Sequence, residues 1–188
     1  MGGIQTMKIM EPSAVHDFYS GVITGTAVKM GTKRLRDIVG AYSEAGEVED
    51  LDRVMYEVYS FENGDPARAG NLNWGLTVMY PELVGEECNF TRGHVHADRS
   101  CAEIYFGLAG QGLLLFMDQD GGAWAEKVCQ GSLHYIDGRW AHRLVNTGDG
   151  VLKVGACWPV TAGHDYQWVE DHPFPVRVFK KNGEIICI

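Results

Sequence analysis

The 188-residue chain lacks the long apolar runs and the basic segments that mark several specialised classes of protein. No apolar run comes close to the ~20 residues that a membrane-spanning helix needs. Lys and Arg number 16 against 25 Asp and Glu, which gives a formal net charge of −9. A chain this acidic repels phosphate backbones and anionic lipid surfaces, so we expect neither nucleic acid nor a membrane as a partner.

The cysteines do not form a disulfide framework or a zinc knuckle in the sequence. Five of them are scattered along the chain, and none belongs to a C-x-x-C pair. An odd, dispersed set is typical of small buried thiols in a reducing compartment. The first residues also lack the apolar core of a secretory signal. The sequence therefore predicts a cytoplasmic protein.

Short strands separated by turn residues dominate the chain after about residue 54. In residues 71–80 apolar side chains alternate strictly, which places Thr77 on the face opposite Leu76 and Val78. Further strands are expected at 54–60, 88–96, 102–109, 112–117, 123–128, 132–136, 143–147, 151–158 and 184–188. Many short strands with little helix indicate an all-β sandwich or closed barrel in one domain, residues 1–188.

Two segments depart from this pattern. Apolar residues from Leu35 to Tyr42 recur at helical spacing, which predicts a short amphipathic helix with Thr32 as its cap. Residues 1 to about 50 are interpreted as an N-terminal extension that contains this helix and packs on the barrel. Pro173 and Pro175 limit residues 164–180 to an edge strand or a loop.

Histidine spacing carries the clearest chemical signal. His94 and His96 are separated by one residue, so in a strand they project from the same face. Glu103 and Tyr105 form a second such pair, and His142 lies in a third strand. Three imidazoles and a carboxylate inside a barrel would hold a divalent first-row metal and leave coordination positions open. Spacing alone leaves metal binding and an ordinary structural role as equal alternatives.

Two longer motifs resemble those of the cupin family. In GHVHADRSCAEIYFGLAGQG the family's histidine, histidine, glutamate and glycine are His94, His96, Glu103 and Gly110. In GSLHYIDGRWAHRLVN its glycine, histidine and asparagine are Gly131, His142 and Asn146. The gap before the glutamate is longer than usual, and Asp137 and Arg139 stand where proline and glycine are usual. The resemblance implies a double-stranded β-helix, or jelly-roll barrel.

From about Gly21 to Glu184 the chain is similar to the archaeal-type, cupin-fold glucose-6-phosphate isomerases. VMYEVYS, NLNWGLTVMYPELVG and TAGHDY are the markers beyond the general cupin motifs. The resemblance implies that the metal ligands are His94, His96, Glu103 and His142, and that Glu103 and His164 are catalytic. It places substrate and phosphate contacts at Thr77, Thr91, Gly93, Tyr105, Tyr166 and Tyr56. Trp158 stands where the family often has tyrosine, so its role is left open.

One of these roles conflicts with a regular strand. Thr91 has the opposite parity to His94 and His96, so in a continuous strand it would face away from them. A bulge near Gly93 would restore its direction. That bulge is an expectation that follows from the assigned role.

The resemblance also implies the reaction and the cofactor. We expect interconversion of glucose 6-phosphate and fructose 6-phosphate, in glycolysis and gluconeogenesis, by a homodimer with one divalent metal per chain. Iron(II) is the first expectation, and manganese(II), nickel(II) and zinc(II) accept the same ligands. Proton transfer by Glu103 through an enediolate and a metal-assisted hydride shift both stay open. The alternative functions are a cupin dioxygenase, a non-catalytic sugar-phosphate-binding cupin, and an isomerase of another phosphosugar such as mannose 6-phosphate.

Overall fold

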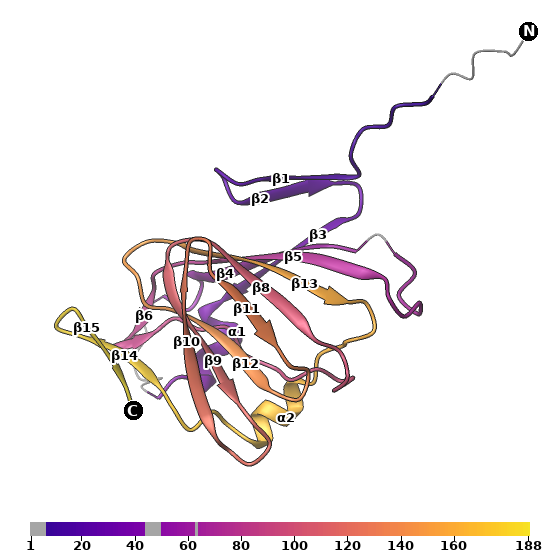
Figure 1. The fold of residues 1–188 in the computed structure, drawn as a ribbon. Coiled ribbons are helices and arrows are strands. Elements are labelled where there is room, and N and C mark those ends of the chain that lie inside the picture. The colour runs from indigo at the N-terminus through magenta and orange to yellow at the C-terminus, as the bar shows by residue number, and fades with distance from the viewer. Residues whose placement is uncertain (1–6, 44–49, 63) are drawn as a thin grey trace, which may run out of the picture.

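The computed structural model of the protein describes residues 7–43, 50–62 and 64–188. Its largest element is a six-stranded antiparallel sheet with the strand order β11-β8-β13-β5-β4-β3. These strands are β3 (Val28–Arg34), β4 (Val54–Phe61), β5 (Leu72–Met79), β8 (Glu103–Ala109), β11 (Leu133–Ile136) and β13 (Leu152–Pro159). Strand β13 lies between β8 and β5, so it joins segments that are distant in the sequence (Figure 1).

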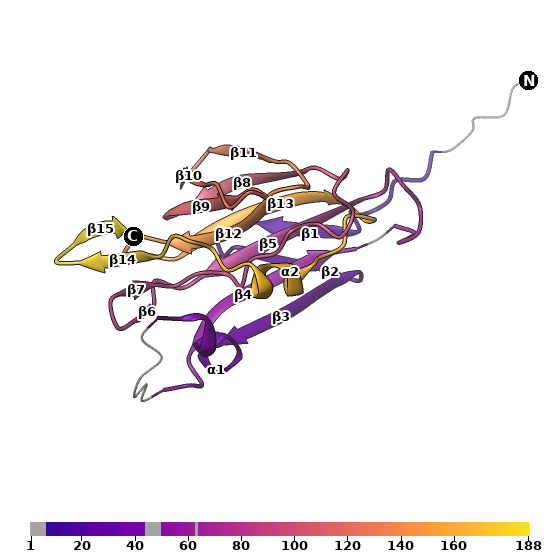
Figure 2. The same cartoon turned by 90° about the horizontal axis from the view of Figure 1, so that it is seen from below.

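Two smaller sheets complete the barrel, and the views in Figures 1 and 2 show how they lie against the first. One has the order β10-β9-β12, from β9 (Gln111–Met117), β10 (Ala123–Cys129) and β12 (Ala141–Asn146). The other contains β6 (Leu83–Val84), β7 (Glu87–Cys88), β14 (Val178–Lys181) and β15 (Glu184–Cys187). Isolated bridges from Phe90 to Val145 and from His94 to His142 add the segment after β7 to the edge of β12.

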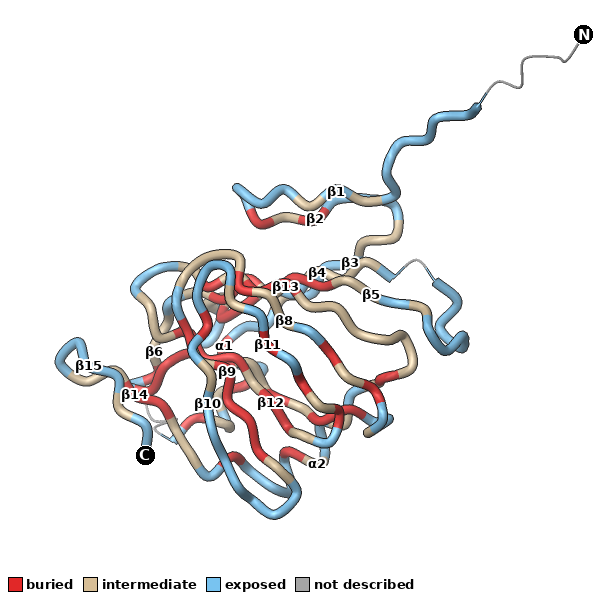
Figure 3. Tube along the Cα trace, in the orientation of Figure 1, coloured by how far each residue is buried: buried red, intermediate tan, exposed pale blue. Residues whose placement is uncertain are grey.

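The core lies between the sheets. Phe116 and Leu114 from β9, Leu144 from β12, Met79 from β5 and Ile136 from β11 are all buried in one cluster. Burying each such side chain contributes roughly 1.5–3 kcal/mol. Strand β10 is mostly exposed, as its pale blue colour in Figure 3 shows. The all-β jelly-roll fold expected from the sequence is confirmed.

A hairpin of β1 (Ala14–Asp17) and β2 (Val22–Gly25) lies outside the barrel, above it in Figure 1. Its Ile23 is buried against Leu76 and Val78, on the face of β5 opposite Thr77. Lys153 donates from β13 to the carbonyl oxygen of Ser20 at 3.1 Å in the hairpin turn. This hairpin was not predicted, because strands of four residues show too few alternations to stand out.

The helical segments differ from expectation in detail. The expected helix is present as α1 (Leu35–Ile38) followed by a 3-10 turn (Val39–Ala41), and Arg34 rather than Thr32 precedes it. A second helix, α2 (Tyr166–Asp171), occupies part of the region expected to be an edge strand or loop. No helix in the described part of the chain is long and apolar enough to cross a membrane.

The expected strand at 88–96 is interrupted. Only Glu87–Cys88 and the single bridges at Phe90, His94 and Val95 pair with neighbours. Gly93 has a φ of 78°, a left-handed conformation that L side chains rarely adopt. The remaining predicted strands are confirmed, with ends shifted by one or two residues.

Candidate active site

Four potential metal ligands converge in the barrel interior. One ligand atom each from His94, His96, Glu103 and His142 lies within 4.8 Å of all the others. Main-chain pairing places the first and last of them, because His142 N–H donates to the His94 carbonyl oxygen at 2.9 Å. Their ring centroids are 4.4 Å apart. We call this set the quartet.

Backbone carbonyls fix the orientation of two of the imidazoles. Nδ1 of His96 lies 2.7 Å from the carbonyl oxygen of Cys101, and Nδ1 of His142 lies 3.2 Å from that of Trp140. Because a carbonyl only accepts, each Nδ1 carries a proton, and each ring in its neutral form presents the lone pair of Nε2. These Nε2 atoms lie 3.1 Å and 3.5 Å from the same Oε2 of Glu103.

The quartet fits a divalent cation. Nε2 of His94 and Nε2 of His142 are buried and have no hydrogen-bond partner among the residues that the structure describes. Lone pairs that face a carboxylate oxygen without a donor between them are costly in a buried site. A cation at their centre offsets that cost, and three nitrogens with one oxygen form a donor set suited to first-row metals.

The pKa shifts of His94 and Glu103 agree with this interpretation, whereas the Glu103 carboxylate outweighs burial and raises the pKa of His96. Burial lowers the pKa of His94 well below its ordinary value, and the nearby His142 and His164 lower it further. Burial alone would raise the pKa of Glu103, but its close contacts with the His142 and His96 imidazoles outweigh burial and hold the pKa below its ordinary value. A neutral imidazole and an ionised carboxylate are the protonation states that metal coordination requires.

A cavity of about 230 Å³ opens beside the quartet. It is lined by three of the four potential ligands, while His96 lies behind them. Its lining also includes every further site residue that the resemblance implied: Tyr56, Thr77, Thr91, Gly93, Tyr105, His164 and Tyr166. The structure thus brings these residues together around one cavity.

The turn at Gly93 explains how Thr91 reaches this cavity. The hydroxyl of Thr91 accepts a hydrogen bond from Leu144 N–H at 3.0 Å and remains free to donate. Because the chain turns at Gly93, the parity rule for a continuous strand does not apply between Thr91 and His94. The expected β-bulge is therefore replaced by a full break in the strand.

The segment after β13 forms another side of the cavity. Asp165 N–H donates to the Val95 carbonyl oxygen at 2.8 Å, which holds this segment beside the quartet. The Asp165 carboxylate also caps α2 by accepting from Trp168 N–H at 3.0 Å. The His164 ring lies 4.3 Å from that of His94 and 5.7 Å from that of Tyr166. Burial lowers the pKa of His164, which favours the neutral imidazole near pH 7.

Trp158 forms an apolar wall of the cavity. Its ring covers Gly75 so closely that a Cβ added there would lie 2.8 Å from it. The indole thus contributes shape at the position where the role of Trp158 was left open.

Sequence reasoning missed part of one strand. Tyr56, Val58, Ser60 and Glu62 all line the cavity, and they alternate along β4 and its end. Once Tyr56 is assigned to the site, the two-residue period of a strand would have indicated the other three.

The comparisons with known proteins agree on one family. The glucose-6-phosphate isomerase family model matches residues 32–187. A glucose-6-phosphate isomerase of Pyrococcus horikoshii is 41% identical and covers 93% of each chain. One from Thermococcus litoralis is 38% identical over 96% of this chain and 95% of its own. A putative glucose-6-phosphate isomerase of Rhizobium meliloti is 34% identical over 86% of this chain and 77% of its own. The chain belongs to the glucose-6-phosphate isomerase family.

Proposed function

We propose that this protein is a metal-dependent isomerase that interconverts glucose 6-phosphate and fructose 6-phosphate. Family membership supports the substrate and the reaction. The single structural observation that carries the proposal is the quartet beside a cavity lined with hydroxyl groups. A divalent ion held by the quartet would polarise the carbonyl group of the open-chain sugar.

The cavity residues would bind the remainder of the sugar phosphate. We assign the phosphate to the hydroxyls of Thr77 and Thr91 and to the backbone amide of Gly93. Binding energy from this remote group would orient the two carbons that react. Burial raises the pKa of Tyr105 well above its ordinary value, so its hydroxyl stays protonated and can donate to a sugar oxygen.

Two side chains are assigned to proton movement. Glu103 would take a proton from one carbon and return it to the neighbouring carbon. Its lowered pKa and its place in the quartet both weaken it as a base, which keeps a hydride shift between the carbons as the competing route. His164, neutral because of its burial, would move protons between sugar oxygens or assist ring opening.

Metal, assembly and location complete the proposal. We propose iron(II) as the ion, with manganese(II), nickel(II) and zinc(II) as competitors for the same ligands. We further propose a cytoplasmic homodimer that acts in glycolysis and gluconeogenesis. The cysteines support a reducing compartment, because all five are free thiols in the structure.

The decisive experiment is a coupled assay with fructose 6-phosphate on chelator-stripped protein, with each metal added back separately. We expect turnover to vanish on stripping and to return with the native metal. Circular dichroism should change little, because a core of this size does not depend on one ion. His96→Ala should lose metal and turnover, whereas His172→Ala, an exposed histidine outside the cavity, should retain both. Full turnover in protein shown by elemental analysis to be metal-free would overturn the proposal.

A further inference from the structure

A second and larger cavity, of about 530 Å³, adjoins the candidate active site. The two cavities share Arg92 and Tyr166 in their linings. The second is also lined by Arg143 and Arg177, so three guanidinium groups border it. We call it the arginine cavity. None of its arginines has a part in the proposed reaction.

Arg143 is a half-buried cation that has no counter-ion among the described residues. Its guanidinium carbon lies 4.6 Å from the ring centroid of Phe90 and 4.4 Å from that of Phe174. No carboxylate in the described part of the chain lies within ion-pair distance of it. The only hydrogen bond that the described residues offer runs from its Nη2 to the carbonyl oxygen of Arg92, at 2.8 Å.

The geometry leaves several donors of Arg143 unused. A guanidinium has five N–H groups in one plane, and here two aromatic rings lie close to it. Nε is buried with no hydrogen-bond partner. The remaining donors lie at the edge of the plane, where an oxyanion can accept two of them at once.

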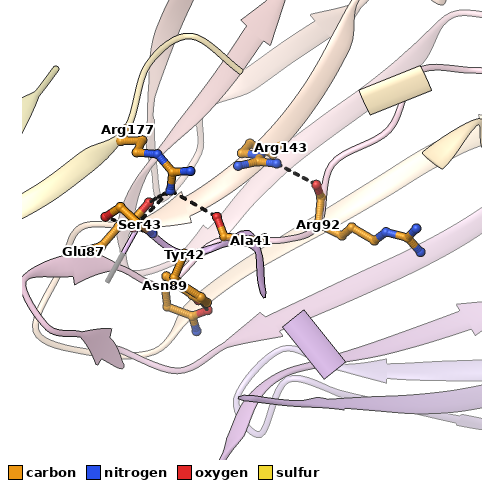
Figure 4. Close-up of polar contacts among 8 residues, drawn as sticks. All are labelled: Ala41, Tyr42, Ser43, Glu87, Asn89, Arg92, Arg143 and Arg177. Atoms are coloured by element: carbon orange, nitrogen blue, oxygen red, sulfur yellow. Dashed lines mark hydrogen bonds and ion pairs between the residues drawn. The ribbon is translucent and has the colours of Figure 1, made fainter. Parts of the chain in front are cut away.

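The other two arginines of the cavity are already paired with carboxylates. Arg177 donates to Glu87 at 2.9 Å and to the carbonyl oxygen of Ala41 at 3.1 Å, as Figure 4 shows. Arg92 extends away from Arg143 in the same view and pairs with Glu170. Asp37, the remaining acid of the lining, accepts from the backbone of Arg34 at 2.9 Å. Among the described residues, Arg143 is therefore the arginine of this lining without a carboxylate partner, and Asp37 is the acid of the lining without a cationic partner.

We propose that the arginine cavity binds a small organic anion, with a phosphate or carboxylate group on Arg143 and an apolar body against Val169 and Phe174. The volume lies within the range of ~300–1,000 Å³ that is common for small-molecule sites. A bound oxyanion would supply the counter-charge that this half-buried guanidinium lacks. The binding itself does not depend on the isomerase reaction.

The same contacts would link this anion to the candidate active site, a step that does rest on the proposed function. Arg143 holds the carbonyl oxygen of Arg92, which lies between the proposed phosphate contacts Thr91 and Gly93. An anion that draws Arg143 toward the cavity would shift this short segment. We therefore expect occupancy of the arginine cavity to change the KM for fructose 6-phosphate by ~5-fold or more, the usual lower range of coupling between two sites.

Gly40 allows this cavity to be blocked selectively. It lines the arginine cavity but not the candidate active site, and a Cβ added there meets nothing within 4 Å. Gly40→Trp should therefore fill the cavity, and Gly40→Ala is the matched control. If Gly40→Trp does not fold, Val176→Trp would fill the arginine cavity from the segment before β14, and Val176→Leu is its control.

The test is isothermal titration calorimetry with inorganic phosphate and, separately, with citrate, in wild type and both Gly40 variants. Titrations are repeated with saturating fructose 6-phosphate, which occupies the candidate active site. We expect wild type and Gly40→Ala to bind one of the anions in the presence of substrate, and Gly40→Trp to bind it ~10-fold or more weakly. A phosphate response identifies a phosphate ligand, and a citrate response identifies a carboxylate ligand.

Identical isotherms for Gly40→Trp and Gly40→Ala would overturn the site. Loss of binding in Gly40→Trp with no effect of the anion on KM in wild type would overturn the coupling alone. The comparison of the Gly40 variants without substrate needs no isomerase activity. Its failure is therefore distinguishable from failure of the proposed function.

Discussion

The two adjoining cavities share two residues but present opposite chemistry. In the smaller cavity, imidazole nitrogens and a carboxylate oxygen meet with no donor between them. In the larger one, guanidinium donors lie at the edge of a half-buried cation with too few acceptors. The first imbalance favours a bound cation, and the second favours a bound anion.

Strand geometry produces this contrast. His142 and Arg143 are consecutive residues of β12, and consecutive side chains of a strand project to opposite faces. His142 therefore lines the smaller cavity and Arg143 lines the larger. One strand can thus contribute to a site that favours a cation and to a site that favours an anion. The 91–93 segment also contributes to both cavities.

The largest expected effect comes from the smaller cavity, in the variant Glu103→Gln. The amide keeps an oxygen for the metal but cannot accept a proton at neutral pH. If Glu103 is both ligand and base, metal content falls partly and turnover per bound metal falls by ~10²–10⁴-fold. Coupled assays combined with elemental analysis measure both quantities, and Glu184→Gln, in the terminal strand β15, is the matched control.

Isotope exchange sharpens the result for Glu103. Turnover in deuterated water should introduce deuterium at the migrating position if a base transfers the proton. Normal turnover per metal in Glu103→Gln, together with no deuterium uptake, would instead support the hydride shift. The quartet would then need Glu103 only as a ligand.

A smaller effect is expected from Thr77→Val, which removes a hydroxyl from the wall facing the quartet. The side chain keeps its size, and the proposed metal ligands are untouched. Loss of one hydrogen bond to a charged group costs ~1.5–3 kcal/mol, so kcat/KM for fructose 6-phosphate should fall by ~10–100-fold. Turnover of unphosphorylated fructose should be poor in wild type and unchanged by the substitution.

Thr24→Val, in the outer hairpin, is the control for that substitution. An equal fall in kcat/KM for fructose and for fructose 6-phosphate in Thr77→Val would remove Thr77 from the phosphate site. Another residue of the smaller cavity would then have to bind the phosphate group.

The smallest effect is expected from Gly93→Ala, at the segment shared by the two cavities. A methyl group there faces a positive φ of 78° and lies 3.1 Å from the Cβ of Arg143. A left-handed conformation costs an L residue roughly 1–2 kcal/mol, which in a chain of this length lowers the Tm by ~2–8 °C. Thermal unfolding followed by circular dichroism measures the change.

Gly31→Ala is the matched control, because Gly31 has no positive φ and its added methyl meets nothing within 4 Å. It should leave the Tm unchanged or raise it slightly. Equal Tm values for the two variants would mean that residues 91–93 change conformation at little cost to accommodate the added methyl group. Residues 91–93 could then not be regarded as a rigid segment between the two cavities.

Local periodicity explains what could be predicted from the sequence. Alternation along a strand is a property of neighbouring residues, so the strands and the shared faces of His94 with His96 were readable without a structure. Strand spacing made Glu103 and His142 candidate ligands beside His94 and His96, and the family resemblance favoured a metal site over an ordinary structural role. The structure shows that both reach the same point in the interior.

What could not be predicted depends on contacts between distant segments. Helix α2 has only six residues, which is too short for a clear helical period. Pro173 and Pro175, which had limited residues 164–180 to an edge strand or a loop, follow the end of this helix and do not interrupt it. The parity conflict at Thr91 was a true signal of irregularity, but it could not distinguish a bulge from a break. No local pattern relates residues 92, 143 and 177, so the arginine cavity became visible only in the folded chain.

The position of β13 has a consequence for how the protein is made. This strand separates β5 from β8, so the six-stranded sheet cannot close before residues 152–159 have left the ribosome. All four members of the quartet are synthesised earlier, and they emerge as part of a chain that still lacks its central strand. Pairings between such distant segments form late in folding. Metal capture is therefore expected to follow completion of the chain, which makes the supply of metal to finished protein, rather than to nascent chains, the step that sets which ion is loaded.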